Sequence, residues 1–554
     1  MNGPNNTEDS KTINAGRYEY WMYRQINKQL TTGELYVENS INHRCFYHEL
    51  VAIEQKEEAL KKLNIPWLER SIEKQVDELT KKLNKLWIEF NDNLKRNKLK
   101  HLQYDDKKQK LRQKKVKASN NERQQKKFYK QFPFRDISDV LHFVDNSCNF
   151  LSAFTPLQPR HSKQELNKNS LVATILAQAF NYGNYKMSQT SDISYRSLET
   201  ISQQYLRLET LKAANDKISN AISNLTIFPH YSLDLALIYG SLDGQKYELD
   251  TPNIKARFSQ KYLREGQGVS AYTMMANHVP LQCELIGAHE HESYYVFDIW
   301  YNNTSDIIPD VLTGDMHSIN KANFAILYRF GVQLQPRFTS FNDQLKNLYC
   351  SNSLGNYSNY VIKPVAQINT KIIIEQKNSM DQLVATLGLK EITQANLIKK
   401  LCHLPPETAL RKAVFELDKL VRSIYTLEYM MDPQLQKTVH KSQNRLESYH
   451  QLRAAIAKIG GKKELYGKTD IDVEISNECN RLVANAIIYY NSVILSAILK
   501  KYGNSTNKKI LAKLKKISPV AWHYHIHFSG QYTFQNANQV IDINEMLKNI
   551  TLNI

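Results

Sequence analysis

Two aspartates stand out because each follows or closes a short apolar segment that its pattern predicts to be a strand. Asp243 comes after the segment 233–239, and Asp315 closes the segment 307–315. Taken singly, Asp243 fits a turn residue beside Gly244, and Asp315 fits a helix cap. Two carboxylates held close together either share a proton or bind cations. Because carboxylate oxygens suit Mg²⁺ or Mn²⁺, the pair would form a metal site if the fold brings it together.

The elements that would position the two aspartates lie between residues 233 and 338. The expected strands are 233–239, 268–278, 281–287, 307–315 and 332–338, with turns at Asp243-Gly244 and around Pro280, and the expected helices are 292–303 and 319–331. Three meandering strands followed by crossover units is the order of a ribonuclease-H-like sheet, in which the first and fourth strands are neighbours. Asp243 and Asp315 would then lie side by side at one edge of the sheet, where open α/β sheets place their chemistry.

Composition and charge indicate a globular protein with a polyanionic partner. The chain has 554 residues, of which 42% are hydrophobic, and a net charge of +18 at pH 7. Length of this order allows several domains, and a strongly basic balance favours nucleic acid as the partner. Residues 95–130 hold 15 Lys and Arg against three acids. This basic segment is predicted to be a linker or a frayed helix along DNA phosphates, with Lys114, Lys115, Lys126 and Lys127 as candidate contacts.

The cysteine pattern and the hydropathy pattern both indicate an intracellular protein. The six cysteines are scattered and none are spaced as CxxC, which argues against a zinc ribbon or a disulfide framework and fits a reducing cytosol. The first residues are polar and unlike a signal peptide. Residues 482–499 carry no charge, but Asn485 and Asn491 lie inside them. A helix buried in a large protein is therefore favoured over a membrane span.

The rest of the chain is predicted to be mainly helical. Expected helices cover 17–30, the region 49–95 with a break near Pro66, 171–180, 197–225 as one helix or two, 410–430, 444–460 and 482–499. A strand is possible at 370–374, and the tail 518–534 has the pattern of a strand. That strand would place His523, His525 and His527 on one side. Without Cys or carboxylate ligands nearby, packing or phosphate contact is favoured there over a metal triad.

Several blocks of sequence are similar to one known family. In chain order they are RYEYWMYRQINKQLTTGELYVENS, LVATILAQAFNYG, SLDGQKY, KARFSQKYLREGQGVSAYT, GDMHSINKANFAILYRFGVQLQPRF, NRLESYHQLR, NAIIYYNS and SPVAWHYHIHFSGQYTF. The blocks from SLDGQKY onward resemble the C-terminal catalytic half of transposases from the Tn-three family of replicative transposons, and the two upstream blocks also look like that family. The resemblance covers nearly the whole chain from about Tyr18.

The resemblance implies a DDE triad on a ribonuclease-H-like fold. The family's first acid sits in an SDGQ-like motif, which matches Asp243, and its second sits in a GD-xH-xxN-like motif, which matches Asp315. Its glutamate lies in a helix reading roughly N-(K/R)-x-E-x-x-H-x-L-R, which matches Glu447 in the first turn and a half of the helix 444–460. Periodicity alone does not separate Glu447 from Glu474 or Glu478. The three acids would hold two Mg²⁺ (or Mn²⁺) ions.

The implied activity is Mg-dependent DNA strand cleavage at transposon ends, followed by transfer of the 3′ ends into target DNA. The expected partners are the inverted-repeat ends, the target DNA and a second copy of the chain, and the expected location is the nucleoid of the bacterial cytoplasm, with no membrane association. Cations that flank the strands could assist by contacting phosphates. They are Lys255, Arg257, Lys261, Arg264 and Arg337.

The expected fold class is an α/β ribonuclease-H-like core with a mixed sheet and a helical insertion, embedded in a mostly α-helical chain. The expected divisions are a helical segment 1–95, the basic linker 96–131, a helical scaffold 132–230, the sheet 231–340, a helical insertion 341–436, the rest of the catalytic domain 437–503 and a tail 504–554. Family members usually carry several hundred further N-terminal residues. Two alternatives therefore stay open: a non-catalytic remnant that binds DNA or dimerises, and a structure-specific metal-dependent nuclease.

Overall fold

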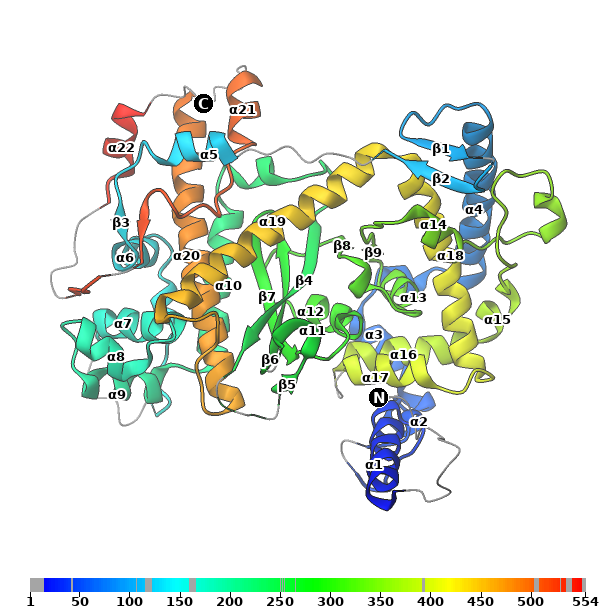
Figure 1. Cartoon of the computed structure of the whole chain (residues 1–554), viewed down its shortest axis with the longest axis horizontal. Coiled ribbons are helices and arrows are strands. Elements are labelled where there is room, and N and C mark those ends of the chain that lie inside the picture. Colours follow the sequence, from blue (N-terminus) through cyan, green and yellow to red (C-terminus); the bar gives the residue numbers. More distant parts are fainter. Residues whose placement is uncertain are drawn as a thin grey trace.

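A mixed sheet lies near the middle of the molecule, with helices on both sides of it (Figure 1). The computed structural model describes residues 14–550 except 41–42, 106, 115–121, 159–165, 250, 252, 254, 265, 391–393, 503–507, 529 and 535–540. Most of the remaining chain is helical. The sequence-based expectation of a mixed sheet within a mainly helical chain is therefore confirmed.

The sheet combines an antiparallel meander with two parallel strands. Its members are β4 (Tyr239–Glu248), β5 (Arg257–Phe258), β6 (Gln267–Ala276), β7 (Val279–Gly287), β8 (Val311–Thr313) and β9 (Gln333–Leu334). β6 pairs antiparallel with β4 and β7, whereas β8 pairs parallel with β4 and with β9. These four pairings give the order β7-β6-β4-β8-β9, and the short β5 also pairs with β6. The expected adjacency of the first and fourth strands is correct.

The first strand lies further along the chain than its apolar pattern predicts. Residues 233–238 form no strand, and Leu235 is fully exposed. The strand instead runs through the expected turn, because Asp243 pairs with Thr273 and Gly244 with Tyr272 in the ladder to β6. Gly244 is needed for close packing rather than for a turn, since a Cβ there would lie 2.1 Å from a carboxylate oxygen of Glu292.

The turn between β6 and β7 also differs from the prediction. Asn277 and His278 form it, with φ values of 47° and 68° in the left-handed region. Pro280 lies within β7, where it pairs with Met275 beside a bulge. Asn is one of the few side chains that adopts this backbone region readily. The turn is therefore made by the Asn-His pair rather than by the proline.

The two expected helices of the sheet region are present. The first comprises the 3₁₀ turn η6 (Glu292–Tyr295) and α12 (Val296–Tyr301), and the second is α13 (Asn323–Arg329). Gly331, with φ of 78°, ends the second helix as predicted. A short 3₁₀ turn, η7 (Met316–Ser318), follows β8, and Asp315 is its N-cap. The chain thus leaves β8 through Asp315.

Helices on one side of the sheet form a compact scaffold. They are α6 (Ile137–Cys148), α7 (Lys168–Ala179), α8 (Gly183–Thr190), α9 (Tyr195–Tyr205), α10 (Leu208–Ser223) and α20 (Asp470–Tyr502). α7 is almost wholly buried, as its apolar run predicts. The region 197–225 is two helices, separated at Leu206 and Arg207, where the Thr210 hydroxyl accepts a hydrogen bond from the backbone N–H of Arg207 (3.1 Å) at the start of α10.

α20 is long and apolar enough to cross a membrane, yet 83% of its apolar window is buried inside the protein. It begins well before the uncharged segment 482–499. Both of its central asparagines have partners: the Asn485 amide donates to the Asn215 Oδ1 atom (2.9 Å), and the Asn491 amide donates to the Pro519 carbonyl (2.7 Å). The expectation of a buried helix is confirmed.

Helices on the other side come from two stretches of the sequence, one at the start of the chain and one that follows β9. They are α1 (Ala15–Thr32), α2 (Phe46–Glu49), α3 (Lys56–Leu63), α4 (Ile72–Lys95), α14 (Phe341–Leu345), α15 (Thr370–Glu375), α16 (Lys377–Leu389), α17 (Gln394–His403) and α18 (Ala409–Met431). Pro66 begins a 3₁₀ turn between α3 and α4, in line with the predicted break. The possible strand at 370–374 is wrong: Asn369 caps a helix there, and that helix packs on α18.

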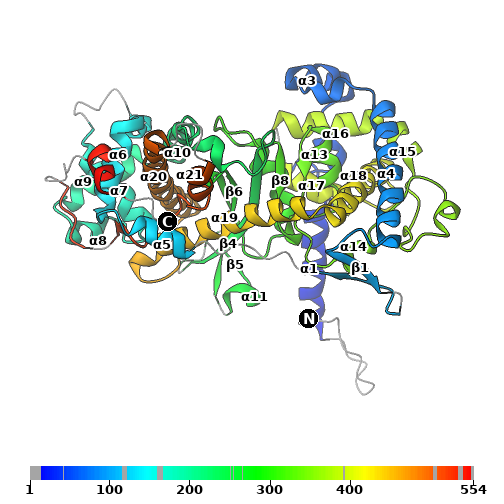
Figure 2. The same ribbon diagram turned by 90° about the horizontal axis from the view of Figure 1, so that it is seen from above.

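A single helix, α19 (Pro433–Ala457), joins the helices after β9 to the sheet. It contacts α18, β4, β8 and α20 and runs across the molecule (Figure 2). The helix starts well before residue 444, so Glu447 lies in its middle and not in its first turns. Asp432 caps it and Pro433 occupies the first turn, where the missing N–H is harmless.

Apart from residues 106 and 115–121, which lie outside the described residues, the basic segment is folded, so its interpretation as a linker or a frayed helix is wrong there. It forms a hairpin of β1 (Leu102–Asp105) and β2 (Lys110–Gln113), then α5 (Glu122–Tyr129). Leu102, Leu111, Phe128 and Tyr129 are buried in the main core. The few apolar residues between the lysines therefore anchor this segment to the body.

The tail is mostly irregular rather than one strand. It contains α21 (Lys508–Leu514), β10 (Ile526–His527) paired with β3 (Arg135–Asp136), and α22 (Ile543–Met546). The three histidines face different partners. His523 stacks on Trp522, His525 stacks on Tyr129, and His527 lies against Phe134. The three histidines therefore pack against aromatic rings, as the sequence favoured over a metal triad.

Candidate active site

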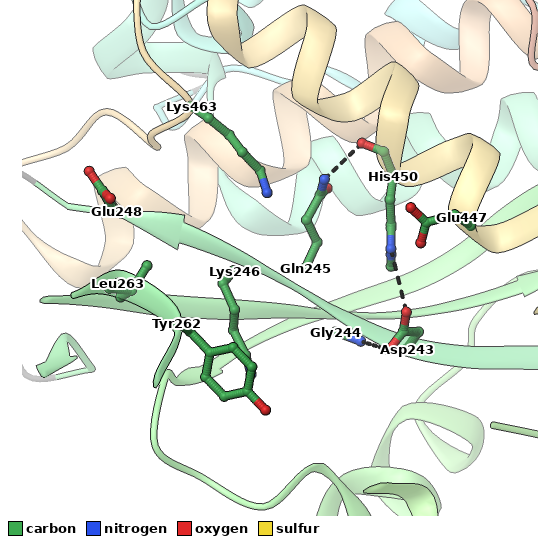
Figure 3. Close-up of a pocket in the computed structure, with 10 residues that line it drawn as sticks. All are labelled: Asp243, Gly244, Gln245, Lys246, Glu248, Tyr262, Leu263, Glu447, His450 and Lys463. Atoms are coloured by element: carbon green, nitrogen blue, oxygen red, sulfur yellow. Dashed lines mark hydrogen bonds and ion pairs between the residues drawn. The ribbon is translucent and has the colours of Figure 1, made fainter. Parts of the chain in front are cut away.

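Asp243, Glu447 and His450 converge from a strand and a helix onto one cavity (Figure 3). One potential ligand atom from each lies within 4.8 Å of those of the other two. The His450 Nδ1 atom is 3.7 Å from the Asp243 Oδ2 atom. Glu447 is exposed and His450 is buried, so the group forms the wall and the floor of an open site. It is the only such cluster of potential ligands among the described residues.

Alternation along β4 explains why this strand faces α19. Residues 241, 243 and 245 point to the same face of the sheet. The Ser241 and Ser442 hydroxyls form a hydrogen bond, and the Gln245 amide donates to the His450 carbonyl oxygen (2.8 Å). These two contacts flank Asp243 along the strand. They hold the middle of α19, and with it Glu447, over the Asp243 side chain.

A fully buried arginine fixes the other side of α19. The Arg453 guanidinium donates to Oδ1 of Asn480 (2.9 Å) and of Asn477 (2.7 Å), both on α20. Arg453 also lies 5.4 Å from the ring centroid of Tyr247 on β4. A buried cation with full hydrogen bonding specifies one geometry, because any displacement leaves it unsatisfied. Arg453 therefore locks strand, α19 and α20 together below the site.

Asp315 lies at the end of the strand next to Asp243. In the parallel ladder, Ser241 pairs with Thr313, so Asp243 and Asp315 both stand two residues beyond a paired position. Asp315 accepts a hydrogen bond from the backbone N–H of His317 (2.7 Å) through its Oδ1 atom. It is not part of the 4.8 Å group. Its negative charge nevertheless helps to raise the pKa of Asp243, as does that of Glu447, so the three acids interact electrostatically.

The pKa of Asp243 is raised to about 7. Burial is the main cause, followed by the negative charges of Glu292, Asp315 and Glu447. Excess negative charge of this kind is what a divalent cation relieves, and the available donors are carboxylate oxygens, which suit Mg²⁺ or Mn²⁺. The donor set thus fits a hard divalent metal.

Glu292 is a fourth acid that sequence reasoning missed. It lies behind β4, on the face opposite Glu447, because Gly244 and Lys246 point there. Its carboxylate accepts hydrogen bonds from the Lys246 amine (2.9 Å) and the Ser270 hydroxyl (3.2 Å). Since Lys246 already neutralises Glu292, this acid tunes Asp243 from behind the sheet rather than facing the cavity. No local motif marks it.

His450 and Lys463 also belong to the site and were not predicted. Burial lowers the pKa of His450 to about 3, with the Arg453 and Lys463 charges adding to the effect. This imidazole is therefore neutral at physiological pH. The signal that would have found it is the three-residue spacing from Glu447, which puts both on one helix face. Lys463, whose pKa is lowered mainly by burial, lies in the loop after α19.

The cavity itself has a volume of about 490 Å³. Its walls come from β4, the segment around α11 (Gln260–Leu263), α19 and the loop after it. The lining residues are Asp243, Gly244, Gln245, Lys246, Glu248, Tyr262, Leu263, Glu447, His450 and Lys463. Asp243 and Glu447 lie toward one end of the cavity, and Lys463 lies with Glu248 toward the other (Figure 3). Such a site can hold a cation and an anionic group next to each other.

The two glutamates that periodicity left open are engaged elsewhere. Glu474 forms an ion pair with Lys255. Glu478 is buried, pairs with Arg481 (2.6 Å) and accepts from the Asn215 amide (3.2 Å). Neither reaches the cavity lining. Of the three glutamates considered, Glu447 is the one that joins Asp243.

The candidate DNA contacts are spread over several surfaces. Arg257, Lys261 and Arg264 are exposed around β5 and α11, and Lys255 is half-buried in its ion pair with Glu474. Arg337 lies next to the site, because its backbone N–H donates to the carbonyl of Gly314, the residue before Asp315 (2.8 Å). Lys114, Lys126 and Lys127 are exposed on the basic segment, and Lys115 lies outside the described residues.

Comparison with known proteins agrees with the family motifs. Residues 139–532 match the model of the family described as Tn3 transposase DDE domain, which is more than half of the chain. The transposase for transposon Tn2501 of Escherichia coli is 26% identical over 74% of this chain and 40% of its own length. The transposase for transposon Tn1546 of Enterococcus faecium is 22% identical over 97% of this chain and 54% of its own length.

A third relative, the transposase for transposon gamma-delta of Escherichia coli strain K12, is 21% identical over 76% of this chain and 41% of its own length. The chain thus spans about half, or less, of the length of these curated relatives. The family match places both β4 with Asp243 and α19 with Glu447 inside the DDE domain. The chain belongs to the Tn3 transposase family.

Proposed function

We propose that this chain cuts and joins DNA strands as the catalytic part of a transposase, with Asp243, Asp315 and Glu447 as its metal ligands. The observation that carries the proposal is the meeting of Asp243 and Glu447, 204 residues apart in sequence, at a cavity beside the strand that ends in Asp315. An acidic cluster of this kind, with a perturbed carboxyl at an open cavity, is typical of a catalytic centre.

The strand order supports a ribonuclease-H-like core. Three antiparallel strands are followed by two parallel ones in the order β7-β6-β4-β8-β9; Asp243 lies on β4, and Asp315 follows its neighbour β8 by two residues. In this proposal residues 341–436 are a helical insertion between Asp315 and Glu447. α19 then returns the chain to the sheet and delivers the third acid.

The reaction would proceed by two displacements at phosphorus. In the first, a water oxygen attacks the phosphorus at a transposon end, the P–O3′ bond breaks, and the 3′ oxygen leaves as a hydroxyl. In the second, that 3′-hydroxyl oxygen attacks a phosphorus of the target DNA and displaces another 3′ oxygen. Each step forms one P–O bond and breaks one, so no covalent protein intermediate is required. Magnesium or manganese bound at the site, as two ions, would stabilise the attacking and leaving oxygens.

The protein's own residues would orient the DNA strand. Asp243 and Glu447 provide carboxylates on the cavity lining, Asp315 adds its charge from the end of the neighbouring strand, and Lys463 provides a cation on the lining. A phosphate group in the cavity would therefore bind with its non-bridging oxygens toward Lys463. The buried, neutral His450 lines the cavity beside Asp243 and Glu447 and would position them without adding charge.

The partners in this proposal are transposon ends, target DNA and a second copy of the chain. Exposed cations around α11 and on the basic segment support phosphate binding over a broad area. Two ends must be cut and joined together, which favours a dimer. The proposed location is the bacterial cytoplasm, at the nucleoid.

The test is a cleavage and joining assay on DNA that carries the terminal repeats of the element encoding this chain, with MgCl₂. Asp243→Asn, Asp315→Asn and Glu447→Gln should each lower the rate by about a thousandfold while DNA binding persists. Glu474→Gln removes an acid that pairs with Lys255 and does not line the cavity, so this control variant should keep the cleavage rate. Binding without cleavage by the unmodified chain would favour the remnant, and cleavage without joining would favour the nuclease.

A further inference from the structure

A second cavity, of about 420 Å³, begins at the residue after Asp315. Three parts of the chain line it: η6 through Tyr294, the segment after Asp315 through Met316 and Lys321, and the α17–α18 pair through His403, Arg411 and Arg422. It is separate from the first cavity, with which it shares no lining residue. The insertion thus builds one wall of a cavity whose other wall leads directly into the candidate active site.

Three cations line this second cavity without a neutralising partner. Lys321, Arg411 and Arg422 form no ion pair with any carboxylate in the described part of the chain. The Lys321 amine and the Arg411 guanidinium lie 6.0 and 4.8 Å from the ring centroid of Phe415. The Nε atoms of Arg411 and Arg422 are buried and have no hydrogen-bond partner. Unsatisfied buried donors of this kind are costly unless a ligand completes them.

The carboxyl group nearest to these cations on α18 does not face the cavity. Asp418 is buried and accepts a hydrogen bond from the backbone N–H of Phe324 (2.9 Å). It attracts Arg422 electrostatically without forming an ion pair with it. The cavity therefore keeps an excess of positive charge, which suits an anionic ligand.

Hydrogen bonds link this cavity to the active-site loop. Arg422 donates to the Gln344 side-chain oxygen (3.2 Å), and the buried Gln344 amide lies 3.7 Å from the Met316 sulfur. On the other side, the His291 ring is 6.2 Å from the His317 ring, and the His317 backbone donates to Asp315. An anion bound by Arg422 would thus be connected to Asp315 through Gln344 and Met316, the residue that follows Asp315.

We propose that the second cavity is a phosphate subsite for the DNA strand that enters the active site. A backbone phosphate neighbouring the reacting one would be held by Arg411, Arg422 and Lys321. Arginine suits this role because its planar fork donates two parallel hydrogen bonds to phosphate oxygens. The volume is in the range of small-ligand sites and leaves room for the attached sugar beside Tyr294 and His403. This inference rests on the proposed DNA strand chemistry and assigns the insertion a part in it.

The first test measures DNA binding without metal, so that cleavage plays no part. A fluorescent 20-nucleotide single strand is titrated with the chain at several salt concentrations. Arg411→Gln and Arg422→Gln should each weaken binding about tenfold and lower the salt slope by about 0.7, because each removes one phosphate contact. Lys412→Gln is the matched control, since Lys412 is the exposed neighbour of Arg411 on α18. Unchanged affinity and slope in the Arg411→Gln, Arg422→Gln double variant would overturn the proposal.

Crosslinking provides a second readout that does not depend on removing the half-buried arginines. A photoreactive p-benzoylphenylalanine in place of Tyr294 should crosslink to the same oligonucleotide, and excess unlabelled oligonucleotide should abolish the product. The same group in place of Tyr185, which is 68% exposed on α8, is the control and should give little product. Bound DNA with no crosslink at position 294 would contradict the proposal.

An Asp243→Asn background separates this inference from the proposed function. In that background the crosslink at position 294 should persist although no strand is cut. If the unmodified chain fails to cleave DNA but crosslinks at position 294, the subsite stands and the catalytic proposal fails. If cleavage occurs without crosslinking, the catalytic proposal stands and the subsite fails.

Discussion

The His450 Nδ1 atom lies 3.7 Å from the Asp243 Oδ2 atom, and Glu447 occupies the preceding turn of the same helix. The strand and the helix that carry the two acids therefore meet through a neutral imidazole. This arrangement ties the chemistry of Asp243 to the placement of α19. The pKa of Asp243 therefore depends on the folded arrangement of the site and can be measured to test it.

Cleavage at low magnesium should lose rate as the pH falls below about 7. Burial and the neighbouring acids raise the pKa of Asp243 to about 7, so a proton competes with the metal below that pH. Above it the carboxylate is ionised and free to bind. Single-turnover rates between pH 5.5 and 8.5 should fall about tenfold per unit at low metal, with a midpoint that moves to lower pH as magnesium rises. Equal midpoints at low and high magnesium would contradict this.

Asp243→Asn should stabilise the metal-free protein at pH 8. The folded-state pKa of Asp243 is raised above its ordinary value of 3.8, so the folded state binds more protons than the unfolded state between about pH 4 and 7. Stability is lost as the pH rises through this window. The gain should be about 1–2 kcal/mol at pH 8, allowing for partial exposure, and smaller at pH 5. Urea unfolding measures both, and added magnesium should stabilise only the unmodified chain.

His450→Gln should lower the cleavage rate about a hundredfold without changing its pH dependence. The pKa of His450 is lowered to about 3, so this side chain does not titrate between pH 5 and 8. Its role is to position Asp243 and Glu447. A rate profile whose midpoint moves in the variant would instead indicate that His450 exchanges a proton during the reaction.

Lys463→Met should weaken cleavage by about ten- to a hundredfold, and Lys463→Arg should restore most of it. Lys463 lines the cavity opposite the acids and would lose its contact with the phosphate oxygens. Lys468→Met, an exposed lysine a few residues on, is the control. Equal losses in both variants would point to a general effect of charge rather than a contact in the cavity.

Glu478→Gln should destabilise the fold without affecting metal affinity. Glu478 is paired with the fully buried Arg481, whose charge would lose its partner. Breaking one member of a buried ion pair costs about 3–5 kcal/mol. Urea unfolding and magnesium titration, measured together, separate this structural acid from the three proposed ligands.

The sequence correctly predicted that the strands associated with Asp243 and Asp315 are neighbours, because the order of the elements is recognisable, although it misplaced the first strand. The apolar run 233–239 has the pattern of a strand, but the position of β4 is set by its pairing with β6. That pairing includes Asp243 and Gly244 in the strand. β-strand preference depends on such partners more than on the segment itself. The Asp-Gly turn signal was therefore overridden.

The third acid could not be found from periodicity, since Glu447, Glu474 and Glu478 all lie on helices. What separates them is tertiary: Lys255 and Arg481 occupy the other two. Motif resemblance supplied Glu447. Glu292 and Lys463 could not be predicted from local sequence for a similar reason. Glu292 packs against Gly244, next to Asp243, only in the folded sheet, and Lys463 reaches the cavity from a loop.

α19 is one unbroken helix that connects α18 to the sheet, so a movement at its Pro433 end would be transmitted along its length (Figure 2). Glu447 lies 14 residues beyond Pro433, which at 1.5 Å per residue is a lever arm of about 21 Å. A tilt of about 5° about the Pro433 end moves Glu447 by about 2 Å, close to the length of a metal–oxygen bond. The contacts of Ser442, His450 and Arg453 with β4 and α20 resist such a tilt, so they keep Glu447 in place against movement of the helices that follow β9.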